Sequence, residues 1–183
     1  MANPFKEPLA SDLYVPATGL VIFGGTGDLT RRKLVPALYN LHCDGYLPDN
    51  FVVVGASRSE LSDEEYRRVV REGVQQFSRR VFDYAHWNAL AGKIFYQQVR
   101  FTESADYSTL KARLQSYAEE RRESVNYLYY LATAPEFFVE IAERLNGAGL
   151  VEDPDSTLCT TRLIVEKPFG RDLESAHVLN GKL

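Results

Sequence analysis

The sequence has few cysteines and no long apolar run. Among its 183 residues, cysteine occurs only twice, as Cys43 and Cys159, with no CxxC pair. That count excludes a disulfide framework and a cysteine zinc site and favours a reducing compartment, so we expect a cytoplasmic protein without a metal. No apolar stretch approaches the roughly 18 residues of a membrane span, and the first residues lack the pattern of a secretory signal. We therefore expect no association with membranes.

The chain also lacks a strong excess of charge of either sign. It carries 21 basic and 25 acidic side chains, which give a formal charge of −4. This balance offers nucleic acid no general attraction, so any anion-binding site has to be local. The 12 glycines and 8 prolines are ordinary numbers for a globular protein, and they exclude collagen-like and low-complexity classes.

The length of the chain suits one domain with a sizeable core. Residues 1–17 contain Pro4, Pro8 and Pro16 and are expected to form an N-terminal arm, with one dinucleotide-binding domain over residues 18–183. The last residues interrupt an expected helix, which suggests that the chain is a piece of a longer protein.

Short apolar segments alternate with amphipathic segments along the chain. The apolar segments are residues 19–23, 51–54, 94–96, 127–131 and 163–165. Near-continuous apolar runs of this kind are typical of strands that are covered on both faces. Apolar residues recur at helical spacing over residues 66–77, 107–117 and 138–145. The alternation predicts an α/β fold with a doubly wound, mostly parallel sheet.

A glycine turn directly follows the first predicted strand. It consists of Gly24, Gly25, Thr26, Gly27, Asp28 and Leu29. Glycines let the backbone bend sharply and approach a ligand closely, and the first N–H groups of the following helix bind anions. The spacing departs from GxGxxG, and glycines after a strand also form simple turns. The strand before and the helix after this turn favour a dinucleotide phosphate site.

Three basic residues, Arg31, Arg32 and Lys33, follow the glycine turn in the first part of the predicted helix. Cations at the positive end of a helix dipole are unfavourable by roughly 0.3–1 kcal/mol each unless an anion compensates them. They form either a solvated basic face or a site for a pyrophosphate or sugar phosphate, and we favour the ligand. Pro36 is expected to kink this helix or to start a second stretch that runs to Cys43.

The second predicted strand ends in Ser57, Arg58 and Ser59, without a carboxylate. At this place in dinucleotide-binding folds, an acidic residue accepts from the 2′-OH of NAD, whereas an arginine holds the 2′-phosphate of NADP. The planar guanidinium of Arg58 suits a phosphate, although an exposed loop also carries arginine without any ligand. These features predict a Rossmann-like NAD(P)-binding domain that prefers NADP, and Glu60 leaves some use of NAD open.

The last predicted strand runs directly into Lys167 and Pro168. Ligands of doubly wound sheets bind beyond the carboxyl ends of the strands. A lysine at such an end is often simply solvated. Here the proline restricts the backbone of Lys167 to extended geometry, which aims its side chain toward that region.

Several of these segments occur in the order seen in one enzyme family. They are Gly-Gly-Thr-Gly-Asp-Leu at 24–29, Asp-Gly-Tyr-Leu-Pro at 44–48, Gly-Ala-Ser-Arg at 55–58, Tyr-Leu-Ala-x-Ala-Pro at 130–135 and Glu-Lys-Pro-Phe-Gly-Arg-Asp-Leu at 166–173. In these segments the chain resembles glucose-6-phosphate dehydrogenases over nearly all residues after Ala17. The resemblance implies the N-terminal coenzyme domain of an enzyme that oxidises glucose 6-phosphate to 6-phosphogluconolactone with NADP+, the first oxidative step of the pentose phosphate pathway.

The resemblance also implies roles for individual residues. Residues 24–29 would bind the coenzyme, and Arg58 would bind its 2′-phosphate. Lys167 would contact substrate and coenzyme, with Pro168 in a cis bond, and Lys33 would lie near the sugar phosphate. The full-length protein would be a homo-oligomer.

Oxidation of a sugar hydroxyl needs a base that takes the hydroxyl proton. In the family this base is a histidine of a second domain, which would follow Leu183. The histidines present here are His42, His86 and His177, all in predicted helical stretches, and we expect structural or solvated roles for them. We therefore expect no turnover by this chain alone.

Two other functions fit parts of the sequence. Tyr107 and Lys111 have the YxxxK spacing of short-chain reductases, but they come before the fourth predicted strand, earlier than that chemistry requires. A non-catalytic NADP-sensing module would have the same fold, because a fold does not by itself decide function.

Overall fold

The structure is a computed structural model that describes residues 16–122, 124–151 and 160–166. Within these residues five strands form one sheet. They are β1 (Thr18–Phe23), β2 (Phe51–Ser57), β3 (Ile94–Gln98), β4 (Asn126–Leu131) and β5 (Thr161–Val165). All neighbouring strands are parallel, in the order β3-β2-β1-β4-β5. The predicted α/β class and the five predicted strands are confirmed, whereas most of the predicted N-terminal arm lies outside the described residues.

Helices connect these strands. They are η1 (Thr30–Leu34), α1 (Val35–Cys43), α2 (Asp63–Phe77), α3 (Tyr84–Ala91), α4 (Ser104–Arg121), η2 (Pro135–Phe137) and α5 (Phe138–Gly147). The helices α2, α4 and α5 confirm the three segments with apolar residues at helical spacing. In the described part of the chain, no helix is both long enough and apolar enough to cross a membrane.

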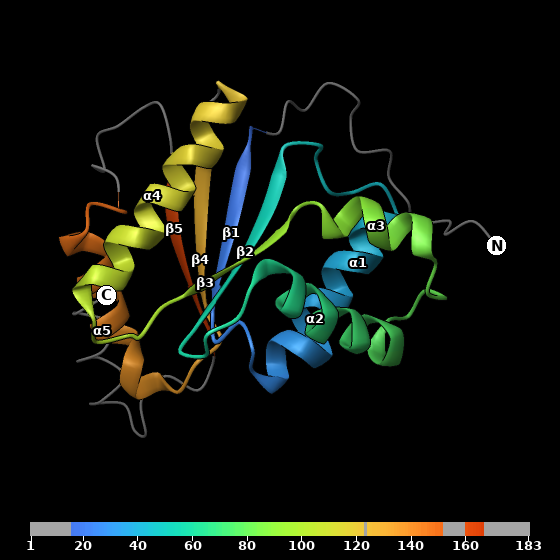
Figure 1. Cartoon of the computed structure of the whole chain (residues 1–183), viewed down its shortest axis with the longest axis horizontal. Helices are drawn as coiled ribbons and strands as arrows, with labels where there is room; N and C mark the ends of the chain where they lie inside the picture. Colours follow the sequence, from blue (N-terminus) through green and yellow to red (C-terminus); the bar gives the residue numbers. More distant parts are fainter. Residues whose placement is uncertain (1–15, 123, 152–159, 167–183) are drawn as a thin grey trace.

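The helices cover both faces of the sheet (Figure 1). Leu20 and Ile22 of β1 belong to a buried cluster with α1, α2 and α3, whereas Val21 and Phe23 belong to a cluster with α4 and α5. Successive side chains of a strand point to opposite faces, so a strand between two helical layers buries every residue. This burial explains the near-continuous apolar runs of the sequence.

The order of the strands creates a switch point beside β1. This strand pairs with β2 on one side and with β4 on the other. The chain therefore builds the sheet outward from β1 to β3 and then returns to build β4 and β5 on the opposite side. In open parallel sheets, ligands bind beyond the carboxyl ends of the strands at such a point. The glycine turn leaves β1 at this place.

The helix after β1 is continuous but widens before Pro36. Its helical backbone starts at Asp28 and passes through the π-turn η1 into α1. In this turn the N–H of Val35 donates to the carbonyl of Thr30, five residues earlier. A proline has no N–H, and its ring collides with the carbonyl four residues before it, so the wider turn makes room for Pro36. Of the two predicted possibilities, a kink at Pro36 or a second stretch that runs to Cys43, the structure shows the second, with α1 over Val35–Cys43; the π-turn was not anticipated.

Candidate functional site

The glycine turn (residues 24–29) is attached to the strands on both sides of β1. The N–H groups of Gly24 and Gly25 donate to the carbonyl of Ala56 in β2, at 2.8 and 3.0 Å. Gly24 has a φ of 85°, and a Cβ at this position would overlap the carbonyl oxygen of Ala132, just after β4. A side chain is excluded here both by the left-handed backbone and by the close approach of β4.

The turn also closes on itself before the helix begins. The N–H of Gly27 and the hydroxyl of Thr30 both donate to the carbonyl of Gly24, at 2.8 and 3.0 Å. The helical backbone starts at Asp28, directly after Gly27. The first N–H groups of a helix have no carbonyl within their own helix, and they mark the positive end of its dipole. This arrangement at the switch point suits a phosphate.

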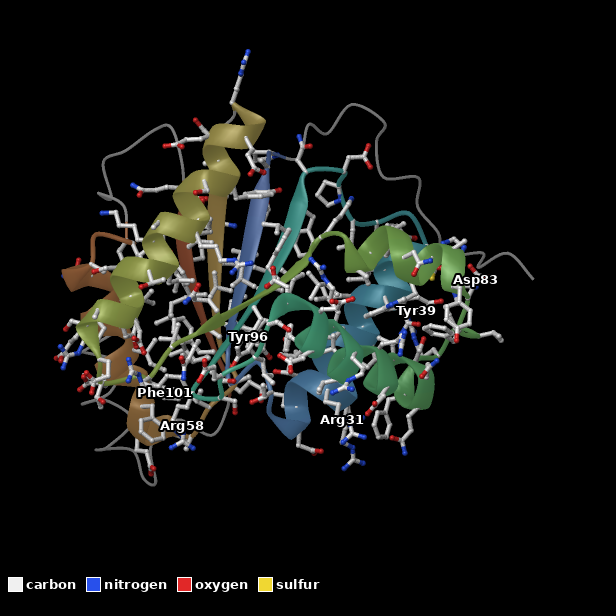
Figure 2. The ribbon with its side chains drawn as sticks, in the orientation of Figure 1. Arg31, Tyr39, Arg58, Asp83, Tyr96 and Phe101 are labelled. Carbon is white, nitrogen blue, oxygen red and sulfur yellow. The ribbon has the colours of Figure 1, made fainter. Side chains whose placement is uncertain are left out.

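Arg58 lies at the end of the neighbouring strand. It directly follows Ser57, the last residue of β2, and its side chain is exposed. The hydroxyl of Thr26 in the glycine turn lies 2.9 Å from the hydroxyl of Ser57. The structure therefore brings the glycine turn and the segment with Arg58 into contact. In Figure 2, Arg58 lies at the lower end of the sheet, and Arg31 lies apart from it on the side of α2.

Two buried tyrosines support this contact from the interior of the protein. The hydroxyl of Tyr66 donates to the carbonyl of Gly25 at 3.1 Å, and the hydroxyl of Tyr96 lies 3.0 Å from that of Ser57. The centres of the two rings are 5.0 Å apart. Burial raises the pKa of both phenols, so both keep their protons at neutral pH. Neither tyrosine was predicted for the site, and the polar Ser57 at the end of an otherwise apolar strand was the one available signal.

The structure gives Arg31 and Arg32 contacts within the protein, and the interpretation of both as ligands of an anion stays a prediction. Arg31 donates to the side chain of Gln76 at 3.5 Å. Arg32 lies 3.4 Å from the carboxylate of Asp28 and 5.1 Å from the ring centre of Phe77. Both polar contacts lie at the long end of hydrogen-bond distances, and the buried Nε of Arg31 has no hydrogen-bond partner within the described residues, so these contacts do not exclude a bound anion.

Lys33 and Lys167 are the candidate residues for the sugar phosphate. Lys33 lies in η1 and is exposed. Lys167 and Pro168 lie outside the described residues, so the expected cis bond lies outside them as well. The residue before them, Glu166, accepts a hydrogen bond of 2.7 Å from the hydroxyl of Tyr130 in β4. Burial, together with this bond to Glu166, raises the pKa of Tyr130 to about 12.

The described histidines lie away from the glycine turn. His42 lies in the last turn of α1 beside His86 of α3, with 6.1 Å between the ring centres. Since α1 starts near the carboxyl edge of the sheet and its chain then enters β2 at the amino edge, this pair lies at the opposite edge from the turn. Burial, and then the charges of Lys93 and His86, lower the pKa of His42. His177 lies outside the described residues.

The YxxxK pair is structural. The hydroxyl of the buried Tyr107 donates to the carbonyl of Phe101 at 3.0 Å, and the ammonium of Lys111 donates to the carbonyl of Ala148 at 3.0 Å. Both groups hold α4 to its surroundings, which does not favour the reductase reading. Within the described residues, no group of three His, Cys, Asp or Glu side chains is placed to hold a metal ion.

Comparisons with known proteins agree on one family. The family profile described as "Glucose-6-phosphate dehydrogenase, NAD binding domain" matches residues 21–183. Glucose-6-phosphate 1-dehydrogenase of Chlamydia muridarum is 43% identical over 166 residues, which cover 90% of this chain and 33% of the relative. The enzyme of the same name from Leuconostoc mesenteroides is 36% identical over 166 residues, which cover 91% of this chain and 33% of the relative.

Solved structures give the same result. A glucose-6-phosphate dehydrogenase in complex with its substrate glucose-6-phosphate superposes with a TM-score of 0.80 at 32% identity, over 93% of this chain and 34% of that one. Glucose-6-phosphate 1-dehydrogenase from Mycobacterium avium gives a TM-score of 0.76 at 34% identity, over 92% of this chain and 34% of that one. The chain thus spans about a third of the length of these relatives.

Proposed function

Because the chain belongs to the glucose-6-phosphate dehydrogenase NAD-binding domain family, we propose that it holds NADP+ in an enzyme that oxidises glucose 6-phosphate to 6-phosphogluconolactone. Its relatives carry the name of that activity, and one of them is solved with this sugar phosphate bound. Residues 18–183 form the dinucleotide-binding domain of this enzyme. NADP+, when bound, supplies the acceptor for the hydride that leaves the sugar.

The contact between Thr26 and Ser57 carries this proposal. It joins the phosphate-binding turn to the segment with Arg58, so one ligand meets both. The pyrophosphate binds at the first N–H groups of the helix, those of Asp28 and Leu29, and the hydrogen-bonded backbone of residues 24–27 holds these groups in place. Arg58 binds the 2′-phosphate of the adenosine ribose, and Lys33 and Lys167 hold the sugar phosphate. The donors of this site are neutral or cationic, which fits a coenzyme with three phosphate groups.

Selectivity for NADP+ follows from the charge at the end of β2. An arginine there gains a charged hydrogen bond from the 2′-phosphate, whereas the ribose of NAD+ offers only a hydroxyl. Glu60, also exposed, is the one nearby carboxylate in this segment and accounts for some use of NAD+.

The full-length protein is a homo-oligomer, and its location is the cytoplasm, as the two cysteines suggest.

Calorimetric titration of the 183-residue chain with NADP+ and with NAD+ tests this proposal. We expect tighter binding of NADP+, and we expect Arg58→Ala to weaken it about tenfold, with little effect on NAD+, because a charged hydrogen bond is lost. Arg79→Ala, which removes an exposed arginine from the loop after α2, is the control and should bind like the wild type. Equal affinities of the wild type for both coenzymes would refute the assignment.

The same samples test the expected absence of catalysis. With glucose 6-phosphate and NADP+ present, we expect the chain to form no NADPH, because neither described histidine lies near the glycine turn. Formation of NADPH at enzyme-like rates, measured by its absorbance, would contradict the expectation that this chain lacks the general base.

A further inference from the structure

The segment that carries Arg58 (residues 57–59) is held by side chains of the neighbouring strand β3. The hydroxyl of Tyr96 donates to the carbonyl of Ser59 at 2.6 Å and lies 3.1 Å from the carbonyl of Ser57. The side-chain amide of Gln98 donates to the carbonyl of Arg58 at 2.9 Å. The carbonyls of Arg58 and Ser59 therefore accept hydrogen bonds from two side chains of β3, and the carbonyl of Ser57 accepts one from the N–H of Val99 at 2.9 Å. The backbone of this segment is fixed on both sides of Arg58.

A chain of hydroxyl groups connects this segment to the glycine turn. The hydroxyls of Thr26 and Ser57 are 2.9 Å apart, and those of Ser57 and Tyr96 are 3.0 Å apart. Each hydroxyl has one hydrogen to donate. Because the shortest bond takes the hydrogen of Tyr96 to the carbonyl of Ser59, Ser57 donates to Tyr96 and Thr26 donates to Ser57. Tyr96 therefore ends a chain that runs from the phosphate-binding turn to the residue after Arg58.

Burial makes this support rigid. Tyr96 is 2% exposed and Ser57 is 6% exposed, whereas Arg58 is exposed. The ring of Tyr96 packs at 5.0 Å from that of Tyr66, whose own hydroxyl holds the carbonyl of Gly25. The guanidinium thus stands in solvent on a backbone that is anchored from the interior. Recognition of a phosphate by a guanidinium depends on orientation as well as charge, so the anchor decides whether the contact forms.

We propose that Tyr96 is a positioning residue that sets the preference for NADP+ over NAD+ by fixing the backbone on both sides of Arg58. This inference rests on the function proposed above for the same site. Only NADP+ has the 2′-phosphate that Arg58 contacts. Movement of residues 57–59 therefore weakens the binding of NADP+ and leaves the binding of NAD+ nearly unchanged. Loss of a residue with a merely structural role would weaken both coenzymes alike.

The test is Tyr96→Phe in the full chain, with NADP+ and NAD+ titrated separately by calorimetry. This variant keeps the ring against Tyr66 and removes the hydroxyl. We expect NADP+ to bind about threefold to tenfold more weakly, the range for the loss of one buried hydrogen bond, and NAD+ to change by less than about twofold. Unchanged binding of NADP+, or equal weakening of both coenzymes, would overturn the inference.

Tyr129→Phe is the matched control. It also removes a buried phenol that donates to a carbonyl, that of Leu150 at 2.9 Å, but from β4 on the face of the sheet that α4 and α5 cover. We expect it to lower the thermal midpoint and to leave the ratio of the two affinities unchanged. A change in that ratio comparable to the change in Tyr96→Phe would show a general effect of stability and refute the role of Tyr96.

A second variant covers the case in which Tyr96→Phe does not fold. Gln98→Leu removes the donor to the Arg58 carbonyl from a partly exposed position, and we expect the same selective loss of NADP+ affinity. The two proposals fail differently. A wild type that binds neither coenzyme refutes the function itself, whereas a preference that Arg58→Ala abolishes and neither Tyr96→Phe nor Gln98→Leu alters refutes only the positioning role.

Discussion

Replacement of Gly24 by alanine is expected to be costly because two effects coincide at this residue. Its φ of 85° costs a residue with a side chain about 1–2 kcal/mol. The added Cβ also meets the backbone carbonyl of Ala132, which cannot move without disturbing the end of β4. Overpacking of this kind costs about 1–3 kcal/mol. We therefore expect a loss of about 3 kcal/mol, which lowers the thermal midpoint of a domain of this size by about 6 to 12 °C.

Gly45→Ala separates the two effects. Gly45 has a similar φ of 73°, but nothing lies within 4 Å of a Cβ placed there. This variant carries the backbone strain alone, so we expect a loss of about 1 kcal/mol and a decrease of about 2 to 4 °C. Thermal unfolding followed by circular dichroism measures both variants.

The binding of NADP+ gives a second measurement on the same two variants. We expect Gly24→Ala to lower the affinity for NADP+ at least about tenfold, because the clash moves the phosphate-binding turn. We expect Gly45→Ala to bind NADP+ like the wild type. Equal midpoints for the two variants would refute the role of the Ala132 contact. Wild-type binding by Gly24→Ala would show that the turn does not have to keep this shape.

Two further predictions concern stability. Ser62→Ala removes a capping box, in which Ser62 and Glu65 exchange hydrogen bonds at the start of α2, and should cost about 1 kcal/mol in urea unfolding; an unchanged urea midpoint would contradict this. Asp106 accepts three hydrogen bonds of 2.8 Å from Arg100, which hold the pKa of its carboxyl below the ordinary value. Because the folded state then favours the ionised form, Asp106→Asn should lower the thermal midpoint at neutral pH, with a difference that shrinks below about pH 4, where the carboxylate takes up its proton. A difference that stays constant at low pH would refute the ionic origin.

The sequence was sufficient for the elements because their signals are local. The five apolar runs are β1 to β5, and the runs are most continuous in β1 and β2 because these strands are buried on both faces. The glycine turn was also visible, because a turn after a buried strand needs residues without a side chain where neighbouring strands come close. Pro36 predicted either a kink or the start of a second helical stretch, and the structure has the second. The π-turn before it was not predicted, since the register of a helix depends on hydrogen bonds that composition does not specify.

The site was only partly predictable because its members meet through pairing of strands. Charge alone suggested an anion near Arg31 and Arg32, and only the structure shows that these side chains also contact Gln76 and Phe77 of α2. Tyr96 was not predicted as part of the site, because it is distant in sequence from both loops that it supports and has no local signal.

The amino-acid sequence by itself determined the class of fold, the order of its elements, the position of the glycine turn and the absence of a carboxylate after β2. These follow from the spacing of apolar residues and from the conformations that glycine and proline allow. Only the tertiary structure decided which loops share the switch point, which cations are already paired, and how Thr26, Ser57 and Tyr96 form one chain of hydroxyl groups. The physical reason is that such contacts depend on which strands become neighbours, and hydrogen bonds between them join residues with no fixed spacing in the sequence.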